Sequence, residues 1–238
     1  MVEKNKEFSS NHTDEFQDGF IVSIVHDLKN LMVPIVSRSE LLMMPNLSEE
    51  KRQTMLKQLN ASCNTLMDAL NKMVRICKDR ANNGTYYFEN FKLNSLVCEV
   101  LDIMEENAES KDIIIRNQIP RDLSVFADKE SIMSVVTNLI GNAIKFTPNG
   151  GEIVVDAEIS DEEIRLCFRD SGVGIDEEKI SDLLKNNHYY STLGTNGESG
   201  TGLGLLLCEA QLQRNHSTLE FSNCSTGGAE FAFRLPIN

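Results

Sequence analysis

The segment Lys129–Phe146, KESIMSVVTNLIGNAIKF, decides the fold of the second half of this chain. Its apolar residues recur every three or four positions, which is typical of a helix with one buried face. That apolar face consists of Ile132, Val136, Leu139 and Ala143. At about 100° per residue, three polar residues share the opposite face within roughly 60°: Asn138, Asn142 and Lys145. The pattern predicts a helix that packs on a sheet and presents two carboxamides and an ammonium group. Such groups suit phosphate and Mg²⁺, but for this helix taken alone a solvated polar face is the simpler explanation.

Two glycine-rich segments follow this helix. Asp170-Ser-Gly172-Val-Gly174 comes directly after a predicted strand, and Gly200-Thr201-Gly202-Leu203-Gly204 opens an apolar helix. A carboxylate at a strand end can accept a hydrogen bond from an exocyclic amine such as that of adenine, and glycines let the backbone approach a flat base. Free N–H groups at a helix N-terminus bind phosphate. A tight turn and a helix start are the purely structural explanations. Neither segment has the spacing of a P-loop or of the Rossmann fingerprint.

The periodicity around these segments predicts an α+β fold. Helices are expected over 93–110, 129–146 and 201–215, among strands that are mostly antiparallel, which suggests a two-layer α/β sandwich. The strands are expected over 86–91, 113–119, 123–126, 152–159 and 163–169, with a closing hairpin of 217–223 and 229–235. Residues 184–200 have no clear period, so we expect a long loop that is functional or disordered.

The first third of the chain predicts two long helices. In the first, apolar residues recur in steps of three or four from Phe16 to Ile35, and Pro45-Asn46 breaks the pattern. Ser48 is a candidate N-cap, and steps of three and four then run from Leu56 to Cys77. We expect an antiparallel helical hairpin over 12–83 that pairs with a second copy as a dimeric four-helix bundle. A hairpin packed on the rest of its own chain is the alternative. The turn Asn82-Asn83-Gly84 predicts a boundary before a second domain over 86–238.

Charge and composition exclude several functions. With 23 basic and 36 acidic residues the net charge is −13, which argues against nucleic acid or an anionic membrane as the main partner. No apolar run is long enough to span a bilayer, and the N-terminus has no secretory signal, so we expect a cytoplasmic chain, or the cytoplasmic core of a longer sensor, without direct membrane insertion. The six cysteines contain no Cys-x-x-Cys pair and are expected to be reduced thiols rather than zinc ligands.

Four segments in this order resemble the sensor histidine kinases of two-component systems. Asn138-Leu-Ile-Gly-Asn142-Ala-Ile-Lys145-Phe-Thr is similar to their N box, 170–174 to the G1 box and 200–204 to the G2 box. Upstream, His26-Asp27-Leu28-Lys29-Asn30 is similar to the H box. The resemblance covers about residues 15–238. Helix geometry places His26 opposite the apolar stripe of Ile24 and Leu28, so we expect an exposed histidine.

The resemblance implies a helical hairpin with a phosphoacceptor histidine, followed by a GHKL-type ATP-binding domain. ATP would bind the second domain, with adenine read by Asp170, phosphates near Lys145, and Mg²⁺ on Asn142. Cofactor-binding residues would be Asn138, Asn142, Lys145, Asp170, Gly172, Gly174, Gly200, Thr201, Gly202, Leu203 and Gly204. His26 would attack the γ-phosphorus with Asp27 as general base, and Asn30 would orient water during dephosphorylation of the partner. The partners would be a second copy of the chain and the receiver domain of a response regulator.

Two alternatives remain open on the sequence. One is a catalytically degenerate, ATP-binding dimeric sensor or scaffold. The other is a GHKL-type ATPase that acts by gated dimerisation. In related ATPases the position of Asn138 holds a Glu that activates water, and an Asn cannot do this, which favours transfer to an imidazole over hydrolysis.

Overall fold

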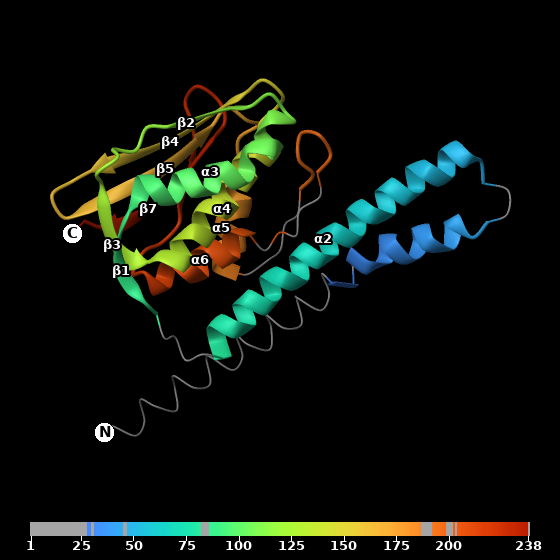
Figure 1. Ribbon diagram of the computed structural model, residues 1–238, viewed down its shortest axis with the longest axis horizontal. Coiled ribbons are helices and arrows are strands. Elements are labelled where there is room, and N and C mark those ends of the chain that lie inside the picture. The colour runs from blue at the N-terminus through green and yellow to red at the C-terminus, as the bar shows by residue number, and fades with distance from the viewer. Residues whose placement is uncertain are drawn as a thin grey trace. The chain divides into compact units, whose positions relative to one another are not determined.

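The computed structural model describes residues 28–29, 31–44, 47–81, 86–186, 192–198, 202 and 204–237. The chain divides into two compact units, Met1–Arg75 and Ile76–Asn238. In Figure 1 the first unit is coloured blue to cyan and the second runs from green to red. No helix in the described parts of either unit is long and apolar enough to cross a membrane.

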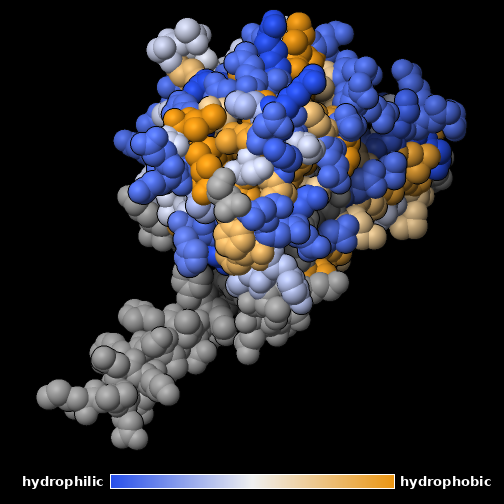
Figure 2. Space-filling view, turned by 60° about the vertical axis from the view of Figure 1, so that its left-hand side comes forward, coloured by the Kyte–Doolittle hydropathy of each residue, from blue (hydrophilic) through white to orange (hydrophobic). Residues whose placement is uncertain are grey.

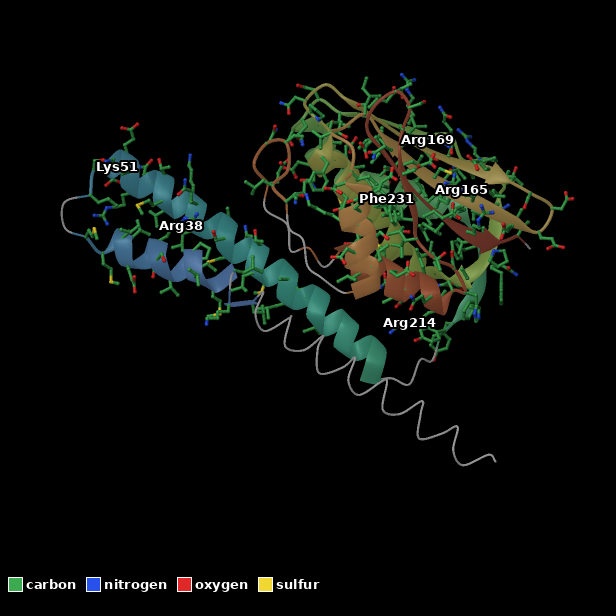
Figure 3. The ribbon with its side chains drawn as sticks, turned by 180° about the vertical axis from the view of Figure 1, so that it is seen from behind. Arg38, Lys51, Arg165, Arg169, Arg214 and Phe231 are labelled. Atoms are coloured by element: carbon green, nitrogen blue, oxygen red, sulfur yellow. The ribbon has the colours of Figure 1, made fainter. Side chains whose placement is uncertain are left out.

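The first unit contains two helical segments joined near residues 43–48. Residues 31–42 are helical, as are Leu28 and Lys29, and the second helix is α2 (Glu49–Ala81), whose last residues belong to the second unit. Ser48 caps α2 as predicted, because its hydroxyl accepts the Lys51 N–H at 3.4 Å. Arg38 donates to the Ser62 hydroxyl at 2.8 Å, and Arg52 donates to the Leu42 carbonyl at 3.1 Å. Figure 3 labels Arg38 on the first helix, from which its side chain reaches α2.

The second unit is built on a five-stranded sheet in the order β2-β4-β5-β7-β6. Strands β2 and β4 are parallel and the other neighbours are antiparallel. A separate antiparallel pair joins β1 and β3. The bounds are β1 (Phe88–Lys92), β2 (Ile114–Asn117), β3 (Ser124–Asp128), β4 (Glu152–Ile159), β5 (Glu163–Asp170), β6 (Glu220–Asn223) and β7 (Ala229–Pro236).

Three helices cover one face of this sheet: α3 (Leu93–Glu109), α4 (Lys129–Phe146) and α6 (Gly204–Arg214) (Figure 1). The core lies between the layers. The predicted apolar face of α4 is buried, with Ile132, Val136 and Leu139 at most 1% exposed. The mixed α/β architecture and its mostly antiparallel sheet are therefore confirmed.

One helix was not predicted. Helix α5 (Glu177–Asn186) occupies the start of the stretch expected to be a loop over 184–200. Its first turn carries Glu177 and Glu178, which the helix dipole favours at an N-terminus. The predicted loop is therefore wrong at residues 184–186, because a short amphipathic helix gives too few turns for its period to be recognised.

The other face of the sheet carries a network of ion pairs across four strands. Arg165 and Arg169 of β5, which Figure 3 labels, both donate to Glu230 of β7. Beneath them Cys167 is fully buried, and burial raises the pKa of its thiol to about 12. Figure 2 shows hydrophilic side chains over most of the visible surface, with apolar side chains in small groups. The charged face thus stays in water while the helical face forms the core.

Candidate functional site

Helix α4 brings the predicted polar residues to the start of α6. Its N-terminus is capped by Asp128, whose carboxylate accepts the Ser131 N–H at 2.8 Å. The Asn138 amide nitrogen donates to the Ser134 carbonyl at 2.9 Å, which directs its Oδ1 away from the helix. A Cβ placed on Gly204 would lie 3.4 Å from that Oδ1 and 3.9 Å from Nδ2 of Asn142. The polar face of α4 and the first turn of α6 are therefore in contact and form one candidate site.

The C-terminal carbonyls of α4 are all bonded within the second unit. The last four carbonyls of a helix have no partner inside the helix. Here the Ala143 carbonyl accepts the Thr147 N–H at 3.0 Å, and the Phe146 carbonyl accepts the Val173 N–H at 3.2 Å. The two carbonyls between them accept the ammonium group of Lys111 at 2.8 and 3.1 Å. The polar face of α4 is thus held in place at its C-terminal end.

Asp170 ends β5 and lies at the base of the same region. It is 8% exposed, and its Oδ1 accepts the N–H groups of Gly172 at 2.8 Å and Ala229 at 3.2 Å. Among the described residues, no hydrogen bond reaches its Oδ2. Burial raises the pKa of the Asp170 carboxyl, and the two backbone hydrogen bonds offset part of the rise. The remaining oxygen is an acceptor for the N–H group of a ligand.

The glycines after Asp170 permit close backbone approaches. A Cβ on Gly172 would lie 2.4 Å from the Phe146 carbonyl oxygen, so only glycine fits between β5 and the end of α4. Gly174 has φ +75°, and the Asn223 side chain holds the next residue by accepting the Ile175 N–H at 2.8 Å. The predicted glycine turn therefore joins α4, β5 and the β6–β7 hairpin.

Lys145 and the segment 192–198 lie together. Lys145 Nζ donates to the Thr192 carbonyl at 2.7 Å, and the Thr195 N–H donates to the Lys145 carbonyl at 3.1 Å. Lys145 therefore joins the segment 192–198 to the C-terminal end of α4.

The structure therefore brings together the described part of the three predicted nucleotide motifs. These residues are Asn138, Asn142, Lys145, Asp170, Gly172, Gly174 and Gly204, with Gly202 two residues before α6. The predicted residues Gly200, Thr201 and Leu203 lie outside the described residues, as do His26, Asp27 and Asn30.

The donor set is compatible with one Mg²⁺. In proteins Mg²⁺ takes oxygen ligands, and in nucleotide sites it is held by one or two protein groups together with phosphate oxygens and water. Next to the start of α6 the structure places the Oδ1 of Asn138 and the Nδ2 of Asn142, and of these two atoms only the amide oxygen is a type of ligand that Mg²⁺ takes. Among the described residues, no cluster of His, Cys, Asp or Glu could hold a metal by itself.

Sequence reasoning missed Lys111, Glu198 and Gly228. Lys111 follows α3 in the segment Glu-Ser-Lys-Asp, which has the composition of an exposed turn, yet the residue is 3% exposed. Gly228 lies in the turn of the predicted closing hairpin. A Cβ on it would lie 1.8 Å from the Asp170 carbonyl oxygen. The Gly-Gly pair was the one available signal for this close approach.

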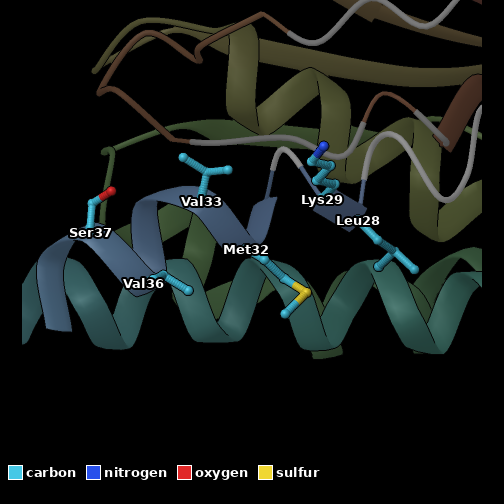
Figure 4. Close-up of a pocket in the computed structure, with 6 residues that line it drawn as sticks. All are labelled: Leu28, Lys29, Met32, Val33, Val36 and Ser37. Atoms are coloured by element: carbon cyan, nitrogen blue, oxygen red, sulfur yellow. The ribbon is translucent and has the colours of Figure 1, made fainter. Parts of the chain in front are cut away.

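The first unit carries a mostly apolar pocket on its first helix, immediately after the predicted phosphoacceptor. Leu28, Lys29, Met32, Val33, Val36 and Ser37 line it (Figure 4). Val33 is 54% exposed.

Comparison with known proteins agrees with this geometry. Residues 127–238 match the family of histidine kinase-, DNA gyrase B- and HSP90-like ATPases. The adaptive-response sensory kinase SasA of Microcystis aeruginosa is 27% identical over 94% of this chain and 60% of its own length. The cell-division control histidine kinase PdhS of Brucella canis is 28% identical over 90% of this chain and 22% of its own length. The chain thus spans less than two thirds of these relatives.

Solved structures of the histidine kinase ThkA are also similar. Its catalytic domain is 31% identical, with a TM-score of 0.54, over 63% of this chain and 95% of that domain. ThkA in complex with the response regulator TrrA is 24% identical, with a TM-score of 0.69, over 92% of this chain and 61% of that one. The latter likeness concerns the fold alone.

The sheet, the three covering helices and the convergence of α4, α6 and Asp170 define a GHKL-type ATP-binding domain. Together with the relatives, they place the chain in the sensor histidine kinase family.

Proposed function

We propose that this chain is an ATP-dependent autophosphorylating protein-histidine kinase of a two-component system. Two contacts with α4 carry the proposal: the first turn of α6 meets Asn138 and Asn142, and Gly172, which is bonded to Asp170, meets the C-terminal end of the helix. These groups come from three separate segments, and each supplies a different part of nucleotide recognition.

The bound nucleotide is oriented by Asp170 and α6. The Oδ2 of Asp170 accepts the exocyclic amine of adenine, while Oδ1 stays bonded to Gly172 and Ala229. The N–H groups at the start of α6, with Gly202 and Gly204, face the phosphates. Gly200, Thr201 and Leu203 complete this segment, and Lys145 contributes an ammonium group. The Asn142 carboxamide oxygen would hold Mg²⁺, which would neutralise charge on the triphosphate.

The phosphoryl group is transferred to His26. A ring nitrogen of neutral His26 attacks the γ-phosphorus in line, so that an N–P bond forms while the bond to the bridging oxygen of ADP breaks. The other ring nitrogen passes its proton to Asp27. Asn138 has an amide in place of a proton-accepting carboxylate. It therefore binds the nucleotide but does not activate water. Asn30 orients the water that removes phosphate from the partner.

We also propose that the first unit dimerises and docks a receiver domain. Along α2, Leu56 and Leu70 belong to the predicted apolar stripe and are exposed, as is Met67, the residue after Leu66 of the stripe. A second copy would cover this stripe and form a four-helix bundle. The mostly apolar pocket after His26, which contains Met32, Val33 and Val36, supports docking of a response-regulator receiver domain, whose Asp accepts the phosphoryl group.

The domain bounds remain part of the proposal. The phosphoacceptor hairpin spans 12–83 and the ATP-binding domain 86–238. The separate contacts of residues 1–75 and 76–238 support two domains, with a division a few residues before the proposed boundary.

The test is incubation with γ-labelled ATP and Mg²⁺, comparing the wild type with His26→Gln. Acid-labile label that disappears in His26→Gln is the expected result. Nucleotide binding without label would favour the degenerate sensor instead. Phosphate release without label, retained in His26→Gln and raised by Asn138→Glu, would favour an ATPase.

A further inference from the structure

Lys111 is a buried cation whose partners come from two distant parts of the chain. Its Nζ lies 2.8 Å from the Ile144 carbonyl oxygen and 3.1 Å from that of Lys145. It also lies 2.7 Å from Thr195 Oγ1 and 2.9 Å from Glu198 Oε1. A lysine is rarely this buried unless its charge is paired, and here one ammonium group joins the end of α4 to the segment 192–198.

The segment 192–198 has a second set of bonds to the same helix end. Thr195 Oγ1 lies 2.9 Å from the Thr147 carbonyl oxygen, and Lys145 donates to the Thr192 carbonyl at 2.7 Å. Within the segment, the Gly194 N–H donates to the Glu198 carbonyl and the Asn196 N–H donates to the Glu198 carboxylate. Lys111 thus binds the two residues, Thr195 and Glu198, through which this small loop is closed.

Glu198 is held in its charged form by this contact. Burial opposes ionisation of its carboxyl, but the hydrogen bond from Lys111 and those from backbone N–H groups outweigh it and keep the pKa below the usual value. The pair is therefore an ion pair at neutral pH, with its cation shielded from water.

The position of Glu198 limits where the phosphate-binding segment can lie. Gly202 is the fourth residue after Glu198, and four extended residues span at most about 14 Å. Fixing Glu198 to the end of α4 therefore limits how far Gly202 can lie from the helix that carries Asn138, Asn142 and Lys145.

We infer that Lys111 is a positioning residue of the nucleotide site, which fixes the segment 192–198 to the C-terminal end of α4 and so restrains the phosphate-binding start of α6. This inference rests on the proposed ATP-binding function. Lys111 itself touches no reacting atom. A purely structural lysine that only caps α4 would support the fold without affecting nucleotide affinity.

The test compares Lys111→Met and Glu198→Gln in the full chain with a matched control, Lys92→Met. Lys92 also donates to a carbonyl, that of Asp122 at 2.8 Å, but at the opposite end of α3. Affinity for ADP with Mg²⁺ is measured by calorimetry, the fold is checked by thermal unfolding, and amide exchange of Thr195 and Gly197 is followed without nucleotide. Both test variants are expected to weaken ADP binding roughly tenfold and to accelerate amide exchange, while Lys92→Met changes neither.

The variant that carries both Lys111→Met and Glu198→Gln is expected to bind ADP about as weakly as Lys111→Met alone. The reason is that the two substitutions remove the same ion pair. Unchanged amide exchange, or faster exchange with unchanged ADP affinity in folded variants, would overturn the inference. If Lys111→Met does not fold, Glu198→Gln decides, since the Glu198 side chain is 36% exposed and its loss is better tolerated. A wild type that fails to bind ADP would instead overturn the proposed function.

Discussion

The backbone of Gly228 passes directly against the carbonyl of Asp170. A Cβ at position 228 would lie 1.8 Å from that oxygen, and the residue has φ +84°. The neighbouring Gly227 has φ +95°, but nothing lies within 4 Å of its Cβ position. The β6–β7 hairpin therefore reaches the strand end that carries the predicted adenine acceptor.

Substituting each of these two glycines by alanine distinguishes the cost of a steric contact from the cost of backbone strain. Gly227→Ala should lower the free energy of unfolding by about 1–2 kcal/mol, the usual cost of a positive φ. Gly228→Ala should cost at least about 3 kcal/mol, because the Asp170 backbone must also move. Chemical denaturation of both variants measures the difference, and equal costs would show that the contact relaxes freely.

Asp170→Asn should weaken nucleotide binding without lowering the stability of the fold. The Asn carbonyl can still accept the N–H groups of Gly172 and Ala229, and the raised pKa of Asp170 means that its ionised form is disfavoured in the fold. We therefore expect an unchanged or slightly higher unfolding temperature and at least a tenfold loss of ATP affinity. A variant that unfolds at a much lower temperature would instead assign Asp170 a structural role.

Adenine binding should weaken in mild acid. The adenine amine needs an ionised acceptor, and burial raises the pKa of Asp170 above its ordinary 3.8. Affinity should therefore fall as the pH drops through this raised value, before ordinary aspartates are protonated. Binding of adenosine, which carries no titratable phosphate, measured by NMR across pH 4–7 tests this. Constant affinity throughout would contradict the role of Asp170.

Glu230 should stabilise the sheet in a pH-dependent manner. Burial opposes its ionisation, but hydrogen bonds from Arg165 and Arg169 outweigh this and lower the pKa of its carboxyl. Its contribution is therefore present above the unfolded value near 4.5 and is lost as the pH falls through the lower folded value.

Glu230→Gln should accordingly lower the free energy of unfolding at pH 7 by about 1–3 kcal/mol, with a smaller deficit below about pH 4. Glu163→Gln is the matched control, because Glu163 pairs with Arg234 at an exposed site and should cost at most about 1 kcal/mol. Urea unfolding at both pH values provides the measurement. A deficit that does not shrink in acid would mean that packing, rather than charge, is lost.

Most of the second unit could be predicted because its signals are local. The period of 129–146 gave the bounds of α4, and alternation over 152–159 gave those of β4. Helix α5 was not predicted, because its ten residues are too few to show a clear helical period. The strand register and the parallel pairing of β2 with β4 depend on contacts between distant segments, which no local pattern contains.

The sequence by itself determined the helices, the strands and the residue types of the nucleotide site, because periodicity and glycine placement act over a few neighbouring residues. Only the tertiary structure decided that Gly204 meets Asn138, that Gly228 abuts Asp170, and that Lys111 is a buried cation rather than an exposed one. These facts depend on where chain segments separated by tens of residues come together. Their physical cause is the burial of the shared apolar face of α3, α4 and α6 on the sheet, which carries the polar groups at the element ends into contact.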